Sequence, residues 1–504
     1  MIARMLESVA LNPVTVKELR QLVRSRFMVV VLVLFLTVLL FTIGVQLIGR
    51  TVQTLAGRPE DLGAGRALFL YLLPILNAAC LLFVPAYVGI RLAAERAGNN
   101  MDLMFITTIT PQMIVRGKFF SGLVITGLLF SVSMPFMAFM YLLRGIDLPS
   151  IFVSLGFSFL VNAAAIQFAI FLASIRVSVA FKAILGLGGL GALFSLVMSS
   201  SLMAAFYFDS GAGVGAGTGE FWAIAGTVAA LLIVFVAVFQ VLSVALLMPA
   251  AANRALPVRV ALTGAWLIGG VIALVWALVK HEPQIVVVWA APALVILAIA
   301  AVMAVSERDA LNFRIRRAIP SNRALRLLAF PFFTGATSAL TWVALISALT
   351  LGVAMAGVHL GGQSGVDTRD CLEVLQRMRL LLLYACCYAL TGALIRRTLL
   401  RNLVPAAATW LVALLLLAAG CLMPVLVGFF LKKVTADSLG AWQLGNIFAA
   451  FGDEAYFSSH FHLAAAWAAA ATVLNFRWLL KQAREFVPAP PTPPDPAEGS
   501  ASNP

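Results

Sequence analysis

The sequence predicts an all-α polytopic membrane protein with about 12 transmembrane helices. Hydrophobic residues make up 62% of the 504 positions and charged residues only 11%, a balance that no soluble core of this size could bury. The apolar residues gather into runs near the roughly 20 residues that a helix needs to cross a bilayer. Of the 35 Lys and Arg residues, 25 lie at the two ends or in every second connection between runs. Because basic flanks stay on the cytoplasmic side, both termini are predicted to be cytoplasmic.

Residues 1–26 precede the first run and are predicted to form a cytoplasmic amphipathic helix. Asn12 fits an N-cap, and Pro13 fits the first helical position. From there one helical face is basic and the opposite face is apolar. The basic face carries Lys17, Arg20 and Arg24, and the apolar face carries Leu19, Leu22 and Val23. This pattern favours a helix that lies in the headgroup plane, and an ordinary basic flank is the alternative.

The apolar runs are expected to span the membrane in chain order, and the first is interpreted as a retained signal anchor. They cover residues 27–48, 67–90, 119–143, 150–175, 183–207, 221–247, 260–279, 285–305, 330–358, 380–395, 403–431 and 461–480. The tenth is the shortest. Prolines in the second and third runs could kink those helices. The last 22 residues, 483–504, are rich in proline and are predicted to be a disordered tail.

The chain is predicted to consist of two six-helix halves, 27–252 and 253–482. Because each half has an even number of spans, a duplication would give both halves the same orientation in the membrane. Glu307-Arg308 stands 25 residues before Phe332-Phe333-Thr334-Gly335, and Glu95-Arg96 stands 24 residues before Phe119-Phe120-Ser121-Gly122. The connection 306–329 would then be the counterpart of the connection 91–118. Chance similarity in an apolar chain is the alternative.

The connection 91–118 combines a charged stretch, a short apolar stretch and a break at Thr110-Pro111. A proline in front of a second helical start indicates two short helices joined by a bend. Such a hairpin could dock in a groove on a partner protein.

These residues resemble the permease subunits of type-2 ABC exporters. The likeness covers about the first 145 residues: the helix at 12–26, then Glu95-Arg96, Asp102-Leu103, Thr110-Pro111 and Gly117-Lys118. Asn99, Asn100 and Thr108 depart from the residues typical of that family. The resemblance implies that residues 91–118 are a coupling hairpin that meets a separate ATPase. The residues expected to make the coupling contacts are Glu95, Arg96, Asp102, Thr110, Pro111 and Lys118.

Other motifs indicate no catalysis, so no enzyme activity and no cofactor are expected in this chain. Residues 186–191 match G-x-G-x-x-G but lie inside an apolar run without a preceding strand, where small residues let helices approach closely. The pair His460 and His462 is too sparse for a metal site and is interpreted as part of a wet outer loop. Cys371 is expected in an outer aqueous connection. The net charge of +14 follows from topology and does not indicate nucleic-acid binding.

The leading hypothesis is therefore a permease subunit of an ATP-driven exporter in a bacterial inner membrane. Its expected partners are a separate ABC ATP-binding subunit and membrane lipids, with a second permease copy as a further candidate. An ion-coupled twelve-helix secondary transporter is one alternative, although the runs hold no Asp, Glu or Lys and only Arg477 near the end of the last. A non-transporting membrane assembly protein is another.

Overall fold

The computed structural model describes most of the chain and confirms the all-α membrane fold. It describes residues 13–56, 64–97, 109–143, 146–175, 179–209, 218–249, 252–308, 310–361, 368–430, 443–452 and 456–489. Twelve helices among these residues are long and apolar enough to span a membrane, and the described residues form no strand. The chain divides into two compact units, 1–248 and 249–504, which are described separately.

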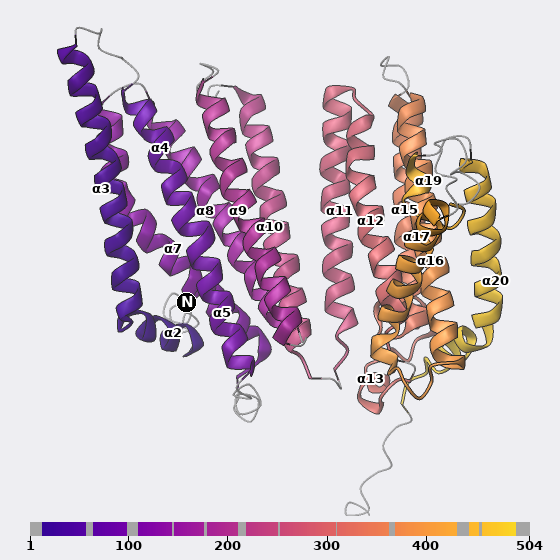
Figure 1. Cartoon of the computed structure of the whole chain (residues 1–504). Helices are drawn as coiled ribbons and strands as arrows, with labels where there is room; N and C mark the ends of the chain where they lie inside the picture. The colour runs from indigo at the N-terminus through magenta and orange to yellow at the C-terminus, as the bar shows by residue number, and fades with distance from the viewer. Residues whose placement is uncertain are drawn as a thin grey trace, which may run out of the picture. The chain divides into compact units, whose positions relative to one another are not determined.

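The first unit contains a short helix and six spanning segments (Figure 1). Their bounds are α2 Pro13–Val23, α3 Arg26–Leu55, α4 Ala64–Ala78 continued by α5 Val84–Ala97, α7 Pro111–Leu142, α8 Leu148–Ser174, α9 Val179–Asp209 and α10 Gly219–Leu247. Side-chain caps fix several starts: Thr110, Asp147 and Thr218 each accept a hydrogen bond from a backbone N–H three residues on. Figure 1 shows α2 lying across the ends of the longer helices, close to the end of α5.

The second spanning segment is broken in the middle by a π-helical turn, η1 Ala79–Phe83. Pro74 lies inside α4 and Pro85 follows the π turn. A proline cannot donate the backbone hydrogen bond of an α-helix, and π turns inside helices are frequent at functional sites. The break separates α4 from α5, and the two parts pack against different neighbours: α9 lies along α4 and η1, whereas α5 lies along α8.

The second unit has six spanning helices and several short ones. Their bounds are α11 Ala255–Lys280, α12 Gln284–Ala304, α13 Phe313–Arg317, α14 Arg323–Ala329, η2 Phe330–Phe332, α15 Ala336–Gly361, α16 Thr368–Thr398, η3 Ala406–Ala408, α17 Thr409–Phe430, α19 Ala449–Gly452 and α20 Phe457–Arg484. His281 caps the end of α11: its backbone is left-handed (φ 55°), and its N–H donates to the carbonyl of Ala277.

The two units share one pattern of helix packing. With the six spanning segments of each unit numbered in chain order, the second contacts the first, third, fourth and fifth in both units. The fourth contacts the third, fifth and sixth, and the third contacts the sixth, again in both. Equivalent segments therefore occupy equivalent neighbourhoods within their own units.

Apolar side chains cover the outer surface of these helices. Large residues such as Phe41, Leu187 and Val288 are mostly exposed, at 70% to 72%. Surfaces of this kind are stable in hydrocarbon, where every backbone polar group must be bonded within a helix. The interior of the first unit holds a continuous apolar core with contributions from α2, α3, α4, α5, α7, α8 and α10.

Two predicted loops prove to be helical, and this corrects two expectations. The helix α16 begins at Thr368, well before the predicted start at 380, so Cys371 is only 7% exposed and packs with Val286, Val358 and Leu375. The helix α20 begins at Phe457, and it buries His460 completely. The Tyr384 hydroxyl lies 2.8 Å from Nδ1 of His460. Cys371 and His460 therefore both lie in buried positions on helices and not in wet outer loops.

The start of the predicted tail is also ordered. Phe486 is buried against Ile315, Ile319 and Phe333, and the N–H of Ala489 donates to the carbonyl of Arg316. An aromatic side chain so close to the end of α20 provides enough apolar surface to hold the chain down. Residues 490–504 lie outside the described part.

Candidate functional site: ionic clusters at the helix ends

The helix α2 presents an acid to the interior of the first unit. Its buried side chains are Val14, Thr15, Glu18 and Leu22, whereas Lys17, Arg20 and Arg24 are exposed. The exposed basic face agrees with the face predicted from the sequence. The buried side is only partly apolar, because Glu18 lies one turn from both Val14 and Leu22.

Lys118 of α7 joins this acid to the end of the second spanning segment. Its Nζ lies 2.9 Å from Oε1 of Glu18 and 2.9 Å from Oε2 of Glu95. The exposed fractions of the three side chains are 2%, 6% and 21%, respectively. Buried charges are stable only when paired and hydrogen-bonded. The three groups therefore hold α2, α5 and α7 together, and they are called the first ionic cluster below.

A second ring of contacts surrounds the first ionic cluster. Lys17 lies 3.7 Å from Glu95, and Arg91 lies 3.7 Å from Glu18. Arg91 also donates to the hydroxyl of Tyr87 at 2.6 Å and to the side chain of Gln21. Longer and more exposed pairs of this kind contribute little individually, but they fix the direction of Arg91.

The other predicted site residues lie around this cluster. Arg96 donates to the carbonyl of Ser174, the last residue of α8, so its charge is directed at a carbonyl end of that helix. Thr110 caps α7 by accepting from the N–H of Met113, and Pro111 is its first residue, as predicted. Asp102 lies outside the described residues. The structure thus brings together Glu95, Lys118 and Lys17. Lys118, which was predicted to contact the ATPase, is paired with Glu18 and Glu95 of the same chain.

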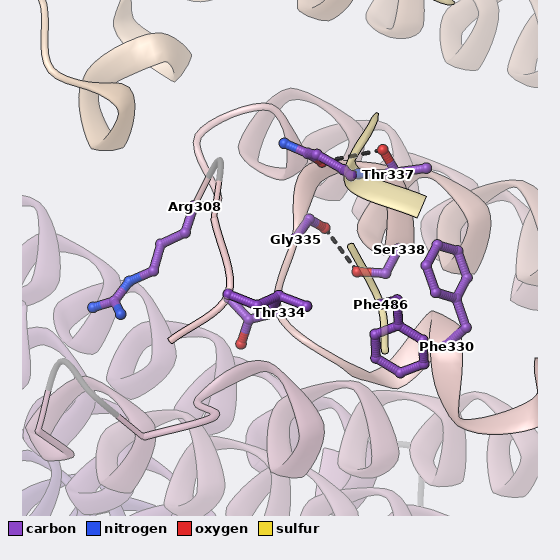
Figure 2. Close-up of a pocket in the computed structure, with 9 residues that line it drawn as sticks. Arg308, Phe330, Thr334, Gly335, Thr337, Ser338 and Phe486 are labelled. Carbon is purple, nitrogen blue, oxygen red and sulfur yellow. Dashed lines mark hydrogen bonds between the residues drawn. The ribbon is translucent and has the colours of Figure 1, made fainter. Parts of the chain in front are cut away.

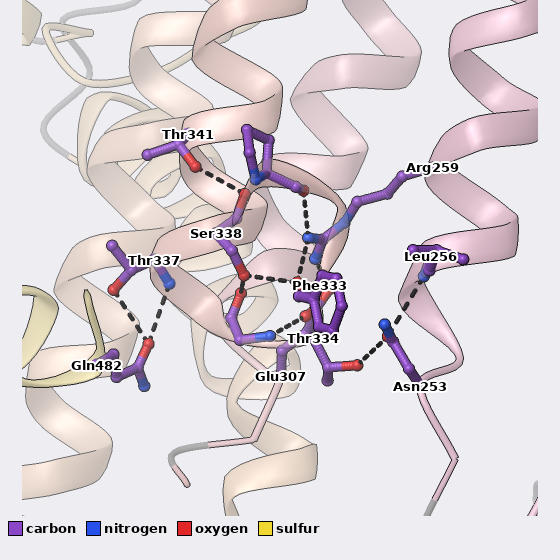
Figure 3. A network of polar contacts seen from close by, with 12 residues as sticks. Asn253, Leu256, Arg259, Glu307, Phe333, Thr334, Thr337, Ser338, Thr341 and Gln482 are labelled. Atoms are coloured by element: carbon purple, nitrogen blue, oxygen red, sulfur yellow. Dashed lines mark hydrogen bonds and ion pairs between the residues drawn. The ribbon is translucent and has the colours of Figure 1, made fainter. Parts of the chain in front are cut away.

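The second unit has a corresponding cluster, shown in Figure 3. Arg259, near the start of α11, pairs with Glu307 and donates to the carbonyls of Pro331 and Phe333, at 2.7 Å each. Glu307 also accepts from the N–H of Gly335 at 2.7 Å. Arg259 is 4% exposed. The contacts of Arg259 and Glu307 are called the second ionic cluster below. In both units the acid that follows the second span is therefore bonded to residues at the start of the third span.

Gly335 has a special backbone in the second ionic cluster. Its φ of +150° is one that side-chain-bearing residues rarely adopt. Beside it lies a cavity of about 20 Å³, room for about one water molecule, and Figure 2 shows Arg308, Thr334 and Thr337 around it. The backbone and the ion pair together fix the entrance to α15.

Sequence reasoning missed Glu18 and Arg259 as structural ions, and it aligned Glu307 with Glu95 without predicting a partner for it. The available signal for Glu18 was its position: it shares a helical face with Val14 and Leu22, and an acid on an apolar face needs a partner. The signal for Glu307 was its spacing to Phe332, which nearly matches that of Glu95 to Phe119. Arg259 had no such signal, since it lies at the edge of an apolar run. Among the described residues, no group of His, Cys, Asp and Glu could hold a metal ion.

No protein-family model, curated protein or solved structure matches this chain. A functional assignment therefore depends on the chain's own residues and their geometry.

Proposed function

We propose that this chain is the membrane-spanning permease subunit of an ATP-driven exporter in a bacterial inner membrane. A separate ATP-binding subunit would supply the energy, and this chain would supply the path. The observation that supports the proposal best is the first ionic cluster, in which Lys118 bonds both Glu18 and Glu95 at 2.9 Å.

The first ionic cluster suits the transmission of a displacement. Residues 98–108 connect α5 to α7, and the cluster lies where these two helices reach that connection. A partner that moves the connection would also move α5 and α7, because their ends are joined through a buried ammonium group. The helix α2 would follow, since Glu18 belongs to the same cluster. Buried ion pairs of this kind resist separation, because parting them leaves an uncompensated charge.

The predicted coupling residues then divide into two roles. Glu95 and Lys118 are positioning residues, because their charges face each other inside the chain. Thr110 and Pro111 fix where α7 begins, and Arg96 carries the link to α8. Direct contact with the ATPase falls to the connection itself, including Asp102. The exposed Lys17, Arg20 and Arg24 would meet anionic headgroups, worth about 1 kcal/mol for each basic residue near the surface.

We further propose that the second unit repeats the first, so that one chain provides both halves of the path. The shared packing of the six helices supports this, as do the two ionic clusters. The short basic helices α13 and α14 would stand where the coupling hairpin stands in the first unit. If the second unit has no such role, a second permease copy would have to complete the path.

One observation favours an ion-coupled carrier as a second candidate function. His460 is buried in a spanning helix and lies 2.8 Å from the Tyr384 hydroxyl. Titratable groups at membrane depth often belong to proton pathways. Transport that requires an ion gradient and no ATP would favour this candidate.

Charge reversal tests the proposed coupling. Asp102→Lys should reduce copurification of the ATPase while leaving membrane insertion intact, because interface charge pairs are worth about 1–5 kcal/mol when desolvated. Glu95→Lys should also reduce it, because this change places a second cation beside Lys118 and parts the first ionic cluster that positions α5 and α7. Glu373→Lys is the control: this acid is 37% exposed and pairs within α16, with Arg369 and Arg377. If both test variants retain as much ATPase as the control, these acids have no part in coupling.

A further inference from the structure

An apolar groove opens on the first unit between α5, α8 and α9. Its volume is about 360 Å³, within the range of roughly 300–1,000 Å³ that is usual for small-molecule sites. Its lining is almost entirely hydrocarbon. Small residues leave the space open: Gly89 and Ala93 of α5, Ala169 and Ala173 of α8, and Gly186 and Gly189 of α9.

The broken second span explains why the groove exists. Before the break in the chain, α4 and the π turn lie along α9. After the break, α5 lies along α8 instead. The helices α5 and α9 therefore diverge after Phe83, and α8 forms the floor between them. Pro85, which lines the groove, is the second residue after the π turn.

The glycines of α9 are only partly explained by close helix packing. A Cβ on Gly189 would come within 2.8 Å of Leu172, which agrees with the close approach predicted from the sequence. A Cβ on Gly186 would meet nothing within 4 Å, although Gly186 lines the groove. The space beside Gly186 is therefore open to a ligand.

A positive charge stands at one end of this groove. Arg96 is one helical turn beyond Ala93, on the same face of α5. Its guanidinium group donates to the carbonyl of Ser174, which adjoins the groove-lining Ala173. A hydrocarbon channel with a cation at one end matches a molecule that has an apolar chain and an anionic head.

We propose that the groove binds one acyl chain of an anionic phospholipid, with the lipid phosphate beside Arg96. Basic residues at the edge of the bilayer attract anionic headgroups, and the apolar lining accepts the chain. This proposal does not depend on ATP-driven transport, because lipid occupancy can be measured on the chain alone.

The test uses the full chain in phosphatidylcholine nanodiscs with a trace of phosphatidylglycerol that carries a photoactivatable group in its acyl chain. Cross-links should map to peptides of α5, α8 and α9. Gly186→Leu fills the groove and should reduce labelling about tenfold, because displacing even two methylene groups costs that much binding. Gly188→Leu is the matched control: its Cβ also meets nothing within 4 Å, but it does not line the groove.

Two further measurements use variants and wild type. Arg96→Gln should reduce the preference for phosphatidylglycerol over an equally labelled phosphatidylcholine by about fivefold. In the wild type, unlabelled phosphatidylglycerol should compete with the label. The proposal is overturned if labelling rises linearly without competition, if Gly186→Leu labels as well as Gly188→Leu, or if the wild type shows no headgroup preference.

Discussion

Replacing Lys118 by Met tests the first ionic cluster most severely. The ammonium group is 2% exposed and lies 2.9 Å from each of two carboxylates. Methionine has a similar length but no charge, so Glu18 would remain 6% exposed with Arg91 at 3.7 Å as its nearest cation. Breaking a buried pair by removing one partner costs about 3–5 kcal/mol. We expect about 3 kcal/mol, since Arg91 and Lys17 compensate part of the charge.

Unfolding of the purified chain in mixed micelles would measure this loss, with limited proteolysis reporting release of α2. Lys17→Met is the matched control, because Lys17 is 52% exposed and lies 3.7 Å from Glu95, so its loss should cost less than about 1 kcal/mol. Adding Glu18→Gln to Lys118→Met should recover part of the stability, because the stranded acid is then neutral. If Lys118→Met costs no more than Lys17→Met, the first ionic cluster does not hold the helices together.

Two other predictions concern the second unit. Gly335→Ala should destabilise it by about 1–3 kcal/mol, since a side chain at φ +150° is strained. Gly352→Ala, inside the following helix α15, should not, because a Cβ there meets nothing within 4 Å. Equal thermal stability of the two variants would contradict this. An impermeant maleimide should label the variant Arg369→Cys, because the native side chain at that position is 84% exposed. The same reagent should not label the buried Cys371 of the wild type. Rapid labelling of Cys371 would mean that α16 begins later than Thr368.

The sequence predicted the helices far better than their ends. Apolar runs identify spans because hydrocarbon excludes polar residues, but α16 continues for three turns through charged residues. There Glu373 pairs with Arg369 and Arg377 at helical spacing, so a helix extends where hydropathy falls. Pairing at a distance of four residues was readable in the sequence, whereas the burial of Cys371 against α12 was not.

The candidate site was predictable only where it is local. Thr110 and Pro111 mark a helix start through their own chemistry, and the structure has that start. The bond between Glu18 and Lys118 joins residues 100 positions apart, and no local pattern specifies which distant cation an acid will meet. The same is true of Arg259 and Glu307, which meet only after α11 and α12 have packed.

The central claim is that a separate ATPase acts on this chain through its connection at 98–108. The most direct measurement is ATP hydrolysis by the complex that purifies with the tagged chain from native membranes in a mild detergent. The account predicts a copurifying ATP-binding-cassette protein that hydrolyses ATP, with its recovery reduced by Asp102→Lys and unchanged by Glu373→Lys. A chain that purifies without any ATP-hydrolysing partner, and whose transport in vesicles follows an ion gradient, would contradict it.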